Sequence, residues 1–277
     1  MTDQQHDSYC LFGAKSLLAR LQNVAKEIDG VRKADDIEAI HDMRLSIKRI
    51  KVVAKLADQL SDNTFNAKVT LATLNKFFKT SGRLRDIQVT KQLLIDLQNA
   101  HLAPVIESFS SREKKQRNKY EQALSTFNKE TLGDIELRLV ERLKGLTAKA
   151  AMAGALLLLS DYLHDIRELF YSSSREKRLH EVRTRLKDIN YLNNIFDEQI
   201  GIETQLNISA ERLRELGELA GSWHDHLNLE MKLGKFIHKH PNIPQQVSIQ
   251  EAINKLQVRK QELQQEYSCI LMNELKI

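Results

Sequence analysis

The chain has 277 residues, of which 42% are hydrophobic and 29% charged, and it contains only 3 Pro and 10 Gly. So few turn-forming residues exclude a many-stranded sheet and favour long helices. The two cysteines, Cys10 and Cys269, are far apart, which excludes a disulfide framework and indicates a reducing compartment. The polar N-terminus is unlike a signal peptide, and the longest apolar run, 150–159, is about half of the ~20 residues that a membrane span needs. We therefore expect a soluble cytoplasmic protein.

The net charge of +5 lies entirely in the first half of the chain. Residues 1–139 carry 23 Lys and Arg against 18 Asp and Glu, whereas residues 140–277 carry 19 of each. A surplus this small does not identify a partner. Aromatic residues make up only 6% of the chain, which disfavours a surface that reads nucleic acid by base stacking.

Helical periodicity is nearly continuous along the chain. In chain order we predict helices over about residues 17–30, 35–60, 62–81, 84–99, 104–129, 135–144, 150–171, 173–197, 207–219, 222–238 and 248–277. Breaks are expected at Ser81-Gly82, at Gly133 and near Gly221, because glycine and serine favour turns. No segment alternates as a strand would, so we predict an all-α fold.

Two separated segments align without a gap when the chain is laid over itself with His41 on His180. Residues 41–53 (HDMRLSIKRIKVV) then lie over residues 180–192 (HEVRTRLKDINYL), and residues 81–89 (SGRLRDIQV) lie over residues 220–228 (AGSWHDHLN). Two motifs that match in one register indicate an internal duplication. We therefore predict two similar helical units, 1–139 and 140–277.

A row of cations follows one side of the helix expected around His41. At ~100° per residue, Arg44, Lys48, Lys51 and Lys55 fall beside this histidine. Apolar residues lie on both sides of the row: Met43, Ile47, Ile50 and Ala54 on one, and Leu45, Val52 and Leu56 on the other. An ordinary solvated face lies opposite a single apolar stripe, so this pattern predicts the lining of a half-enclosed groove between helices.

The second copy repeats this row with His180, Arg183 and Lys187, between the apolar residues Val182, Leu186, Ile189, Tyr191 and Ile195. Enclosed cations repel one another, and a polyanion removes that cost. Arg offers two-pronged hydrogen bonds to phosphate oxygens, Lys offers point charges and His can donate from its ring. The alternative is that each cation forms a surface ion pair with an acidic neighbour.

At these residues the sequence resembles the CHAD family, the conserved histidine α-helical domains. The motifs are HDMRLSIKRIK from His41, GRLRDIQV from Gly82, HEVRTRLK from His180 and GSWHDHL from Gly221, and their order covers about residues 10–240. The resemblance implies two antiparallel four-helix bundle units related by a pseudo-twofold axis, which together form one CHAD domain. A basic groove between the units would bind inorganic polyphosphate.

Carried over by position, the resemblance implies a set of polyphosphate-binding residues: His41, Arg44, Lys48, Lys51, Arg83, Arg85, His180, Arg183 and Lys187. Lys55, from the same row, and His224, which stands where the first copy has Arg85, complete the candidates. Asn190 and Asn194 replace Lys51 and Lys55 in the second copy, so we expect the N-terminal copy to hold the ligand more tightly.

The triphosphate-tunnel motif E-x-E-x-K, which often accompanies this family, does not occur, so the chain resembles a stand-alone member. We expect a non-enzymatic polyphosphate-binding protein that needs no cofactor or metal, is cytoplasmic, and is associated with polyphosphate granules and their proteins. The same residues would also serve an interaction scaffold on such granules.

Two other functions use different features. The dipeptide His-Asp at 41–42, 164–165 and 224–225 suggests an HD-type metal-dependent phosphohydrolase, although the cationic surroundings of His41 would repel a metal. A nucleic-acid-binding helical protein would also need the positive charge, and the run 112–119 (REKKQRNK) is either a solvated helix face or an accessory anion contact. Asp86 and Asp225 would either orient Arg85 and His224 or cap helices.

Overall fold

The computed structural model describes residues 37–61, 65–127, 129–143, 147–171, 175–196 and 208–274. Within these ranges the chain is helical and contains no strand, as predicted. The helices are α2 (Ile37–Gln59), α3 (Ala67–Thr70), α4 (Ala72–Asp96), η1 (Ala100–Leu102), α5 (Ala103–Thr126), α6 (Lys129–Leu143), α7 (Ala148–Tyr171), α8 (Arg175–Ile195), α10 (Ala210–Lys239) and α11 (Gln246–Glu274). The helix expected over 17–30 lies outside the described residues.

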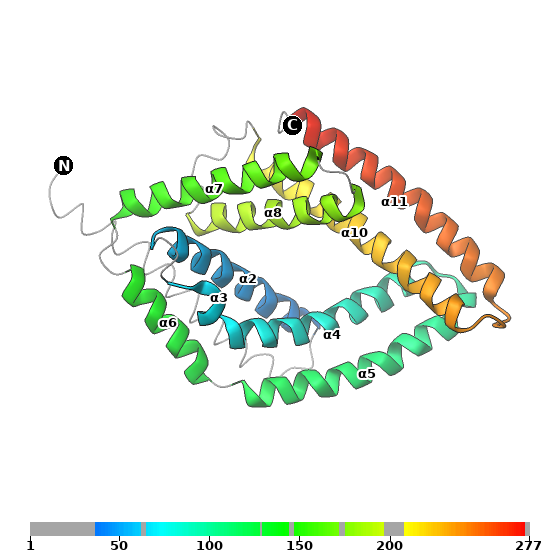
Figure 1. Cartoon of the computed structure of the whole chain (residues 1–277). Helices are drawn as coiled ribbons and strands as arrows, with labels where there is room; N and C mark the ends of the chain where they lie inside the picture. The colour runs from blue at the N-terminus through cyan, green and yellow to red at the C-terminus, as the bar shows by residue number, and fades with distance from the viewer. Residues whose placement is uncertain are drawn as a thin grey trace.

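The two helices that carry the cation rows, α2 and α8, pack against each other near the centre of the molecule (Figure 1). Each is also packed against a long helical hairpin: α2 against α4, which pairs with α5, and α8 against α10, which pairs with α11. The far ends of the hairpins meet, where α11 contacts η1. Helix α7 covers both α8 and α2, and α6 packs against α2.

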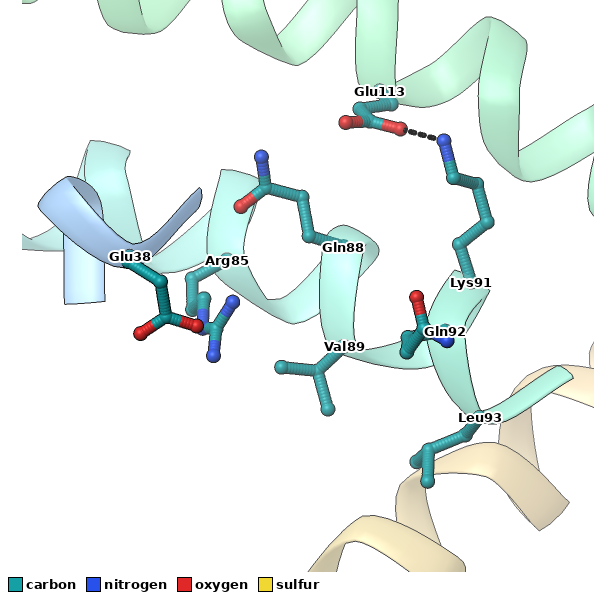
Figure 2. Close-up of a pocket in the computed structure, with 8 residues that line it drawn as sticks. All are labelled: Glu38, Arg85, Gln88, Val89, Lys91, Gln92, Leu93 and Glu113. Atoms are coloured by element: carbon teal, nitrogen blue, oxygen red, sulfur yellow. Dashed lines mark hydrogen bonds and ion pairs between the residues drawn. The ribbon is translucent and has the colours of Figure 1, made fainter. Parts of the chain in front are cut away.

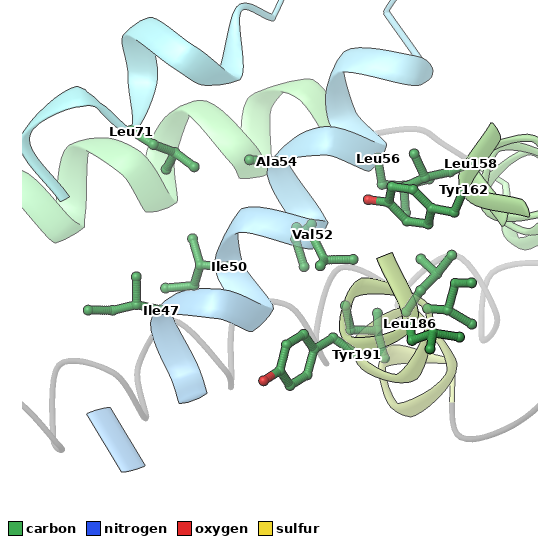
Figure 3. Close-up of a cluster of buried hydrophobic side chains, with 14 of the residues drawn as sticks. Ile47, Ile50, Val52, Ala54, Leu56, Leu71, Leu158, Tyr162, Leu186 and Tyr191 are labelled. Atoms are coloured by element: carbon green, nitrogen blue, oxygen red, sulfur yellow. The ribbon is translucent and has the colours of Figure 1, made fainter. Parts of the chain in front are cut away.

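The hydrophobic core joins the two halves of the chain. Figure 3 shows its central part, where Val52 and Leu56 of α2 point toward Tyr162 of α7 and Leu186 and Tyr191 of α8, and Ile50 lies on the opposite side of α2. A second cluster joins the hairpin ends, with residues such as Leu102 and Phe109 from the first half and Leu233 and Ile249 from the second. The halves are therefore packed as one body. Among the described residues, no helix is both long and apolar enough to cross a membrane.

Buried positions coincide in the two halves in the predicted register, which places His41 over His180. On α4 and α10 the buried pairs are Leu74/Leu213, Phe77/Leu216, Ser81/Ala220, Leu84/Trp223, Thr90/Leu229 and Leu94/Leu233. Helices α2 and α8 match in the same way. The halves thus share one packing register, while their origin by duplication stays a prediction, as does the boundary between Leu139 and Val140, which lies within α6.

The predicted breaks at Ser81-Gly82, Gly133 and Gly221 are wrong, because α4, α6 and α10 run through them. The hydroxyl of Ser81 donates to the carbonyl oxygen of Phe78 at 3.0 Å, a bond that a helical turn accommodates. A glycine inside a helix costs about 1 kcal/mol and does not end it when packing holds the helix on both sides. The joint assigned to Gly133 falls instead at Phe127, between α5 and α6.

Candidate functional site

Five cations from both halves come together where α2 packs against α8. They are Arg44, Lys48 and Lys51 of α2 and Arg183 and Lys187 of α8, and we call them the central cluster. All five side chains are half-buried. The apolar residues on both sides of each row are buried or packed against the core, as the bracketed pattern predicted. The structure therefore brings together two cation rows that lie in opposite halves of the sequence.

Burial and mutual repulsion lower the pKa values of these lysines. Burial, followed by the charges of Lys187 and Arg44, lowers the pKa of Lys48 to about 7. Burial, followed by the charge of Arg44, lowers the pKa of Lys51 to about 8, against an opposing contribution from Asp188. Without a bound anion, the charged forms of these lysines are therefore energetically less favourable than they would be in water.

The α8 side of the cluster shows the same effect. Burial, followed by Arg183, lowers the pKa of Lys187 to about 8, although Asp225 opposes the shift. Burial also lowers the pKa of Arg183. The Nε atom of Arg183 is buried and has no hydrogen-bond partner among the described residues. A buried charged donor without a partner is costly, and an anion would satisfy it.

The ring of Phe78 on α4 lies against two cations of the central cluster. The guanidinium of Arg44 lies 4.0 Å from the centre of this ring, and the ammonium of Lys51 lies 3.8 Å from it. Arg44 also donates to the carbonyl oxygen of Phe78 at 2.6 Å and to the hydroxyl of Ser81 at 3.0 Å. A Cβ atom at Gly82 would lie 2.9 Å from Nη1 of Arg44, so any other residue here would displace the end of that side chain. The sequence pattern does not predict a role for Phe78, because its position beside these cations depends on packing between α2 and α4.

Lys55, the last cation of the α2 row, forms an ion pair with an acidic residue. Its ammonium lies 2.6 Å from Oδ2 of Asp188 on α8 and 5.1 Å from the ring centre of Tyr162. This is the surface ion pair that the alternative interpretation expected. The assignment of Lys55 to ligand binding stays a prediction.

At the N-terminal end of the α2 row, His41 lies near Arg85 of α4. Burial, then the charges of Arg85 and Lys48, lower the pKa of His41, and Arg85 also contributes to lowering the pKa of Arg44 to about 10. Arg83 is two residues away from Arg85, so the two side chains point to different sides of α4. Arg83 is exposed and lies outside the central cluster.

A pocket of about 460 Å³ adjoins this end of the row (Figure 2). Arg85 and Glu38 lie at one side of it, and an ion pair between Lys91 and Glu113 closes the other. Arg85 thus lines the pocket and also acts on the pKa of His41.

In the second half of the chain, two histidines lie at the N-terminal end of the α8 cation row. Nδ1 of His180 on α8 lies 3.2 Å from Nδ1 of His224 on α10, and the amide nitrogen of Asn228 lies 3.0 Å from Nε2 of His224. With that amide donating, His224 carries its proton on Nδ1 and donates it to His180. Burial, followed by Arg183 and His180, lowers the pKa of His224 to about 3, so this pair is neutral at physiological pH.

Neither aspartate of the matched pair caps a helix, because Asp86 and Asp225 lie inside α4 and α10. Asp86 accepts from the ammonium of Lys232 at 2.7 Å, which ties α4 to α10. Asp225 adjoins the central cluster and opposes the lowered pKa of Lys187. Within the described ranges, no group of three or more His, Cys, Asp or Glu side chains is arranged to hold a metal ion.

Comparison with known proteins agrees with this architecture. The model of the CHAD domain family matches residues 15–230, which is most of the chain. The chain belongs to the CHAD domain family. This CHAD protein is also similar to the crystal structure of the CHAD domain from the plant Ricinus communis, with a TM-score of 0.74 and 15% sequence identity over 95% of this chain and 90% of that chain. At that identity the likeness shows the fold alone. A comparison with curated proteins finds no match.

Proposed function

We propose that this CHAD protein binds inorganic polyphosphate at the central cluster and does not cleave it. The observation that carries the proposal is the meeting of five half-buried cations from α2 and α8. Burial lowers the pKa of all five, and repulsion from other members of the cluster lowers the pKa of the three lysines further. A bound polyanion replaces repulsion with attraction and supplies acceptors to donors such as Nε of Arg183.

The shape of the cluster favours an extended chain of phosphates. Side chains three or four residues apart on a helix are ~5–6 Å from one another, so the row from His41 to Lys51 forms a ladder about 15 Å long. Each unit of a polyphosphate chain presents charged oxygens, which match such a ladder. Arg44 and Lys51 already engage the ring of Phe78, so this aromatic group is not a free platform for a nucleic-acid base.

Titration of long-chain polyphosphate, tripolyphosphate and single-stranded RNA tests this proposal. The double variant Lys48→Ala/Lys187→Ala should lose at least about a hundredfold in polyphosphate affinity, because hydrogen bonds to charged groups contribute about 1.5–3 kcal/mol each. The matched control Lys239→Ala/Lys255→Ala removes two exposed lysines of α10 and α11 and should bind as the parent protein does. RNA that binds as tightly as polyphosphate, or a double variant that behaves like the control, would contradict the proposal.

The metal-dependent phosphohydrolase is separated by one further measurement. Its His-Asp dipeptide at 224–225 lies beside Arg183 and Lys187, whose charges repel a cation. Incubation of the protein with long-chain polyphosphate and Mn²⁺ should release no orthophosphate, and release that depends on His224 would overturn the non-catalytic assignment. A cytoplasmic location and association with polyphosphate granules stay predictions.

A further inference from the structure

The hairpin of α4 and α5 carries seven exposed Lys and Arg side chains outside the central cluster, and five of them form two short rows. These five are Lys76, Lys79 and Arg83 on α4 and Lys115 and Lys119 on α5, and we call them the outer face. None of the five has an acidic partner among the residues that the structure describes. The neighbouring exposed acid on α4, Asp86, is already paired with Lys232.

The five cations lie on one side of the hairpin. The three α4 cations are spaced by three and four residues, which places them within about 60° of one another around the helix. The two α5 lysines are four residues apart and also share a face. The amide of Gln116 donates to the carbonyl oxygen of Thr80 at 3.3 Å, so the hairpin pairs this part of α5 with this part of α4. The two short rows therefore lie side by side.

The outer face is continuous with the central cluster through Lys79. Lys79 follows Phe78, whose ring centre is 3.8 Å from the ammonium of Lys51. The charge of Lys79 is also among those that lower the pKa of Lys51. A polyanion lying on Lys51 is thus within the electric field of Lys79 and can extend over the edge of α4 toward it.

The equivalent surface of the second half lacks these five cations. In the register shared by the two halves, Lys76 and Lys79 correspond to Glu215 and Glu218, and Arg83 corresponds to Ser222. The register is secure here because the buried positions of α4 and α10 coincide. Glu218 is exposed and would repel a polyanion, whereas the exposed Glu215 is paired with Arg212 at 2.8 Å.

We propose that the outer face binds the part of a long polyphosphate chain that extends beyond the central cluster, so that long chains leave the site over α4 and α5 only. This inference rests on the proposed function. Every aromatic side chain of α4 and α5 is buried or half-buried. The outer face therefore offers charge but no exposed ring on which a base could stack, which favours polyphosphate over nucleic acid. The outer face then discriminates by length: a short chain fills the cluster, while a long chain gains the additional contacts.

The test is a quadruple variant, Lys76→Gln/Lys79→Gln/Lys115→Gln/Lys119→Gln, titrated with tripolyphosphate and with long-chain polyphosphate at several salt concentrations. Long-chain affinity should fall at least about tenfold at low salt, and its salt dependence should become shallower, because fewer cations neutralise the chain. Tripolyphosphate affinity should stay unchanged. Because all four side chains are exposed, circular dichroism and the melting temperature should show intact folding.

A matched control removes the same charge elsewhere: Lys149→Gln/Lys235→Gln/Lys239→Gln/Lys255→Gln, also exposed. If both quadruple variants lose equal long-chain affinity, only net charge matters and the outer face is not a site. Equal losses for tripolyphosphate and long chains, or a loss for RNA alone, would also overturn the inference. If the parent protein binds neither polyphosphate, the proposed function itself has failed, which is a separate outcome.

Discussion

The two halves of this protein share their buried positions and differ in their exposed charges. Helices α4 and α10 bury equivalent residues, such as Phe77 and Leu216, yet one exposes Lys79 where the other exposes Glu218. Packing constrains the volume and shape of a buried side chain, whereas substitution of an exposed side chain leaves the stability nearly unchanged. A repeated fold can therefore keep one architecture while its two surfaces specialise for different contacts.

The ends of the cation rows differ as well. His41 lies near the charged Arg85, whereas His180 faces the neutral His224. At physiological pH the second pair can offer hydrogen bonds and no net charge. Together with Asn190 and Asn194, this makes the N-terminal half the more cationic side of the site. Three predictions test this asymmetry.

The largest effect is expected from pH. In the free protein the pKa of Lys48 is about 7 and that of Lys187 is about 8, so both side chains are charged below about pH 7. Above these pKa values the two lysines of the free protein lose their protons. A polyanion binds the charged forms, so binding takes up protons and the affinity falls as the pH rises. One unit of pKa corresponds to about 1.4 kcal/mol, so Lys48 alone predicts up to about a hundredfold loss between about pH 7 and about pH 9.

The variants Lys48→Arg and Lys187→Arg separate the contributions of the two halves, because arginine stays charged. Lys48→Arg should flatten the pH profile from about pH 7 upward, and Lys187→Arg only from about pH 8. Calorimetric titration in two buffers of different ionisation enthalpy measures the proton uptake. Profiles that are identical for both variants, or no uptake at about pH 8, would show that these lysines do not titrate on binding.

A smaller effect is expected from exchanging the residues at the ends of the rows. Arg85→His should weaken polyphosphate binding about tenfold, and His224→Arg should strengthen it by a similar factor, because a charged contact contributes about 1.5–3 kcal/mol. Binding curves at low and physiological salt measure both changes. Equal weakening by both variants would mean that each position serves packing, and the proposed asymmetry would be lost.

The smallest effect concerns the two matched glycines. Gly221 has open space around it, so Gly221→Ala should stabilise α10 by about 0.5–1 kcal/mol. At Gly82 the new Cβ would displace the guanidinium of Arg44, and the loss of its contacts to Phe78 and Ser81 should offset that gain. Urea unfolding measures both. In an Arg44→Ala background the two substitutions should become equivalent, and a persistent difference would refute this explanation.

Helical periodicity made much of the site predictable. The apolar residues on both sides of the cations predicted that α2 and α8 would be enclosed, and the burial of residues such as Ile47 and Leu186 confirms it. Helical geometry alone also separates Arg83 from Arg85, since residues two apart point in different directions. The breaks expected at Ser81-Gly82 and Gly221 failed because glycine was interpreted as a local signal. At Gly82 its role is tertiary, since it admits the side chain of Arg44.

The amino-acid sequence by itself determined the helical class, the register between the halves and the cationic rows, because these depend on periodicity along one chain. Only the tertiary structure decided which cations meet. It placed Asp188 against Lys55, which is far from it in the sequence, and brought Lys187 beside Lys48. It also laid Phe78 beneath two members of the cluster. The net charge of +5 has meaning only after this step, because the energy of a charge depends on its burial and on the distance to its neighbours.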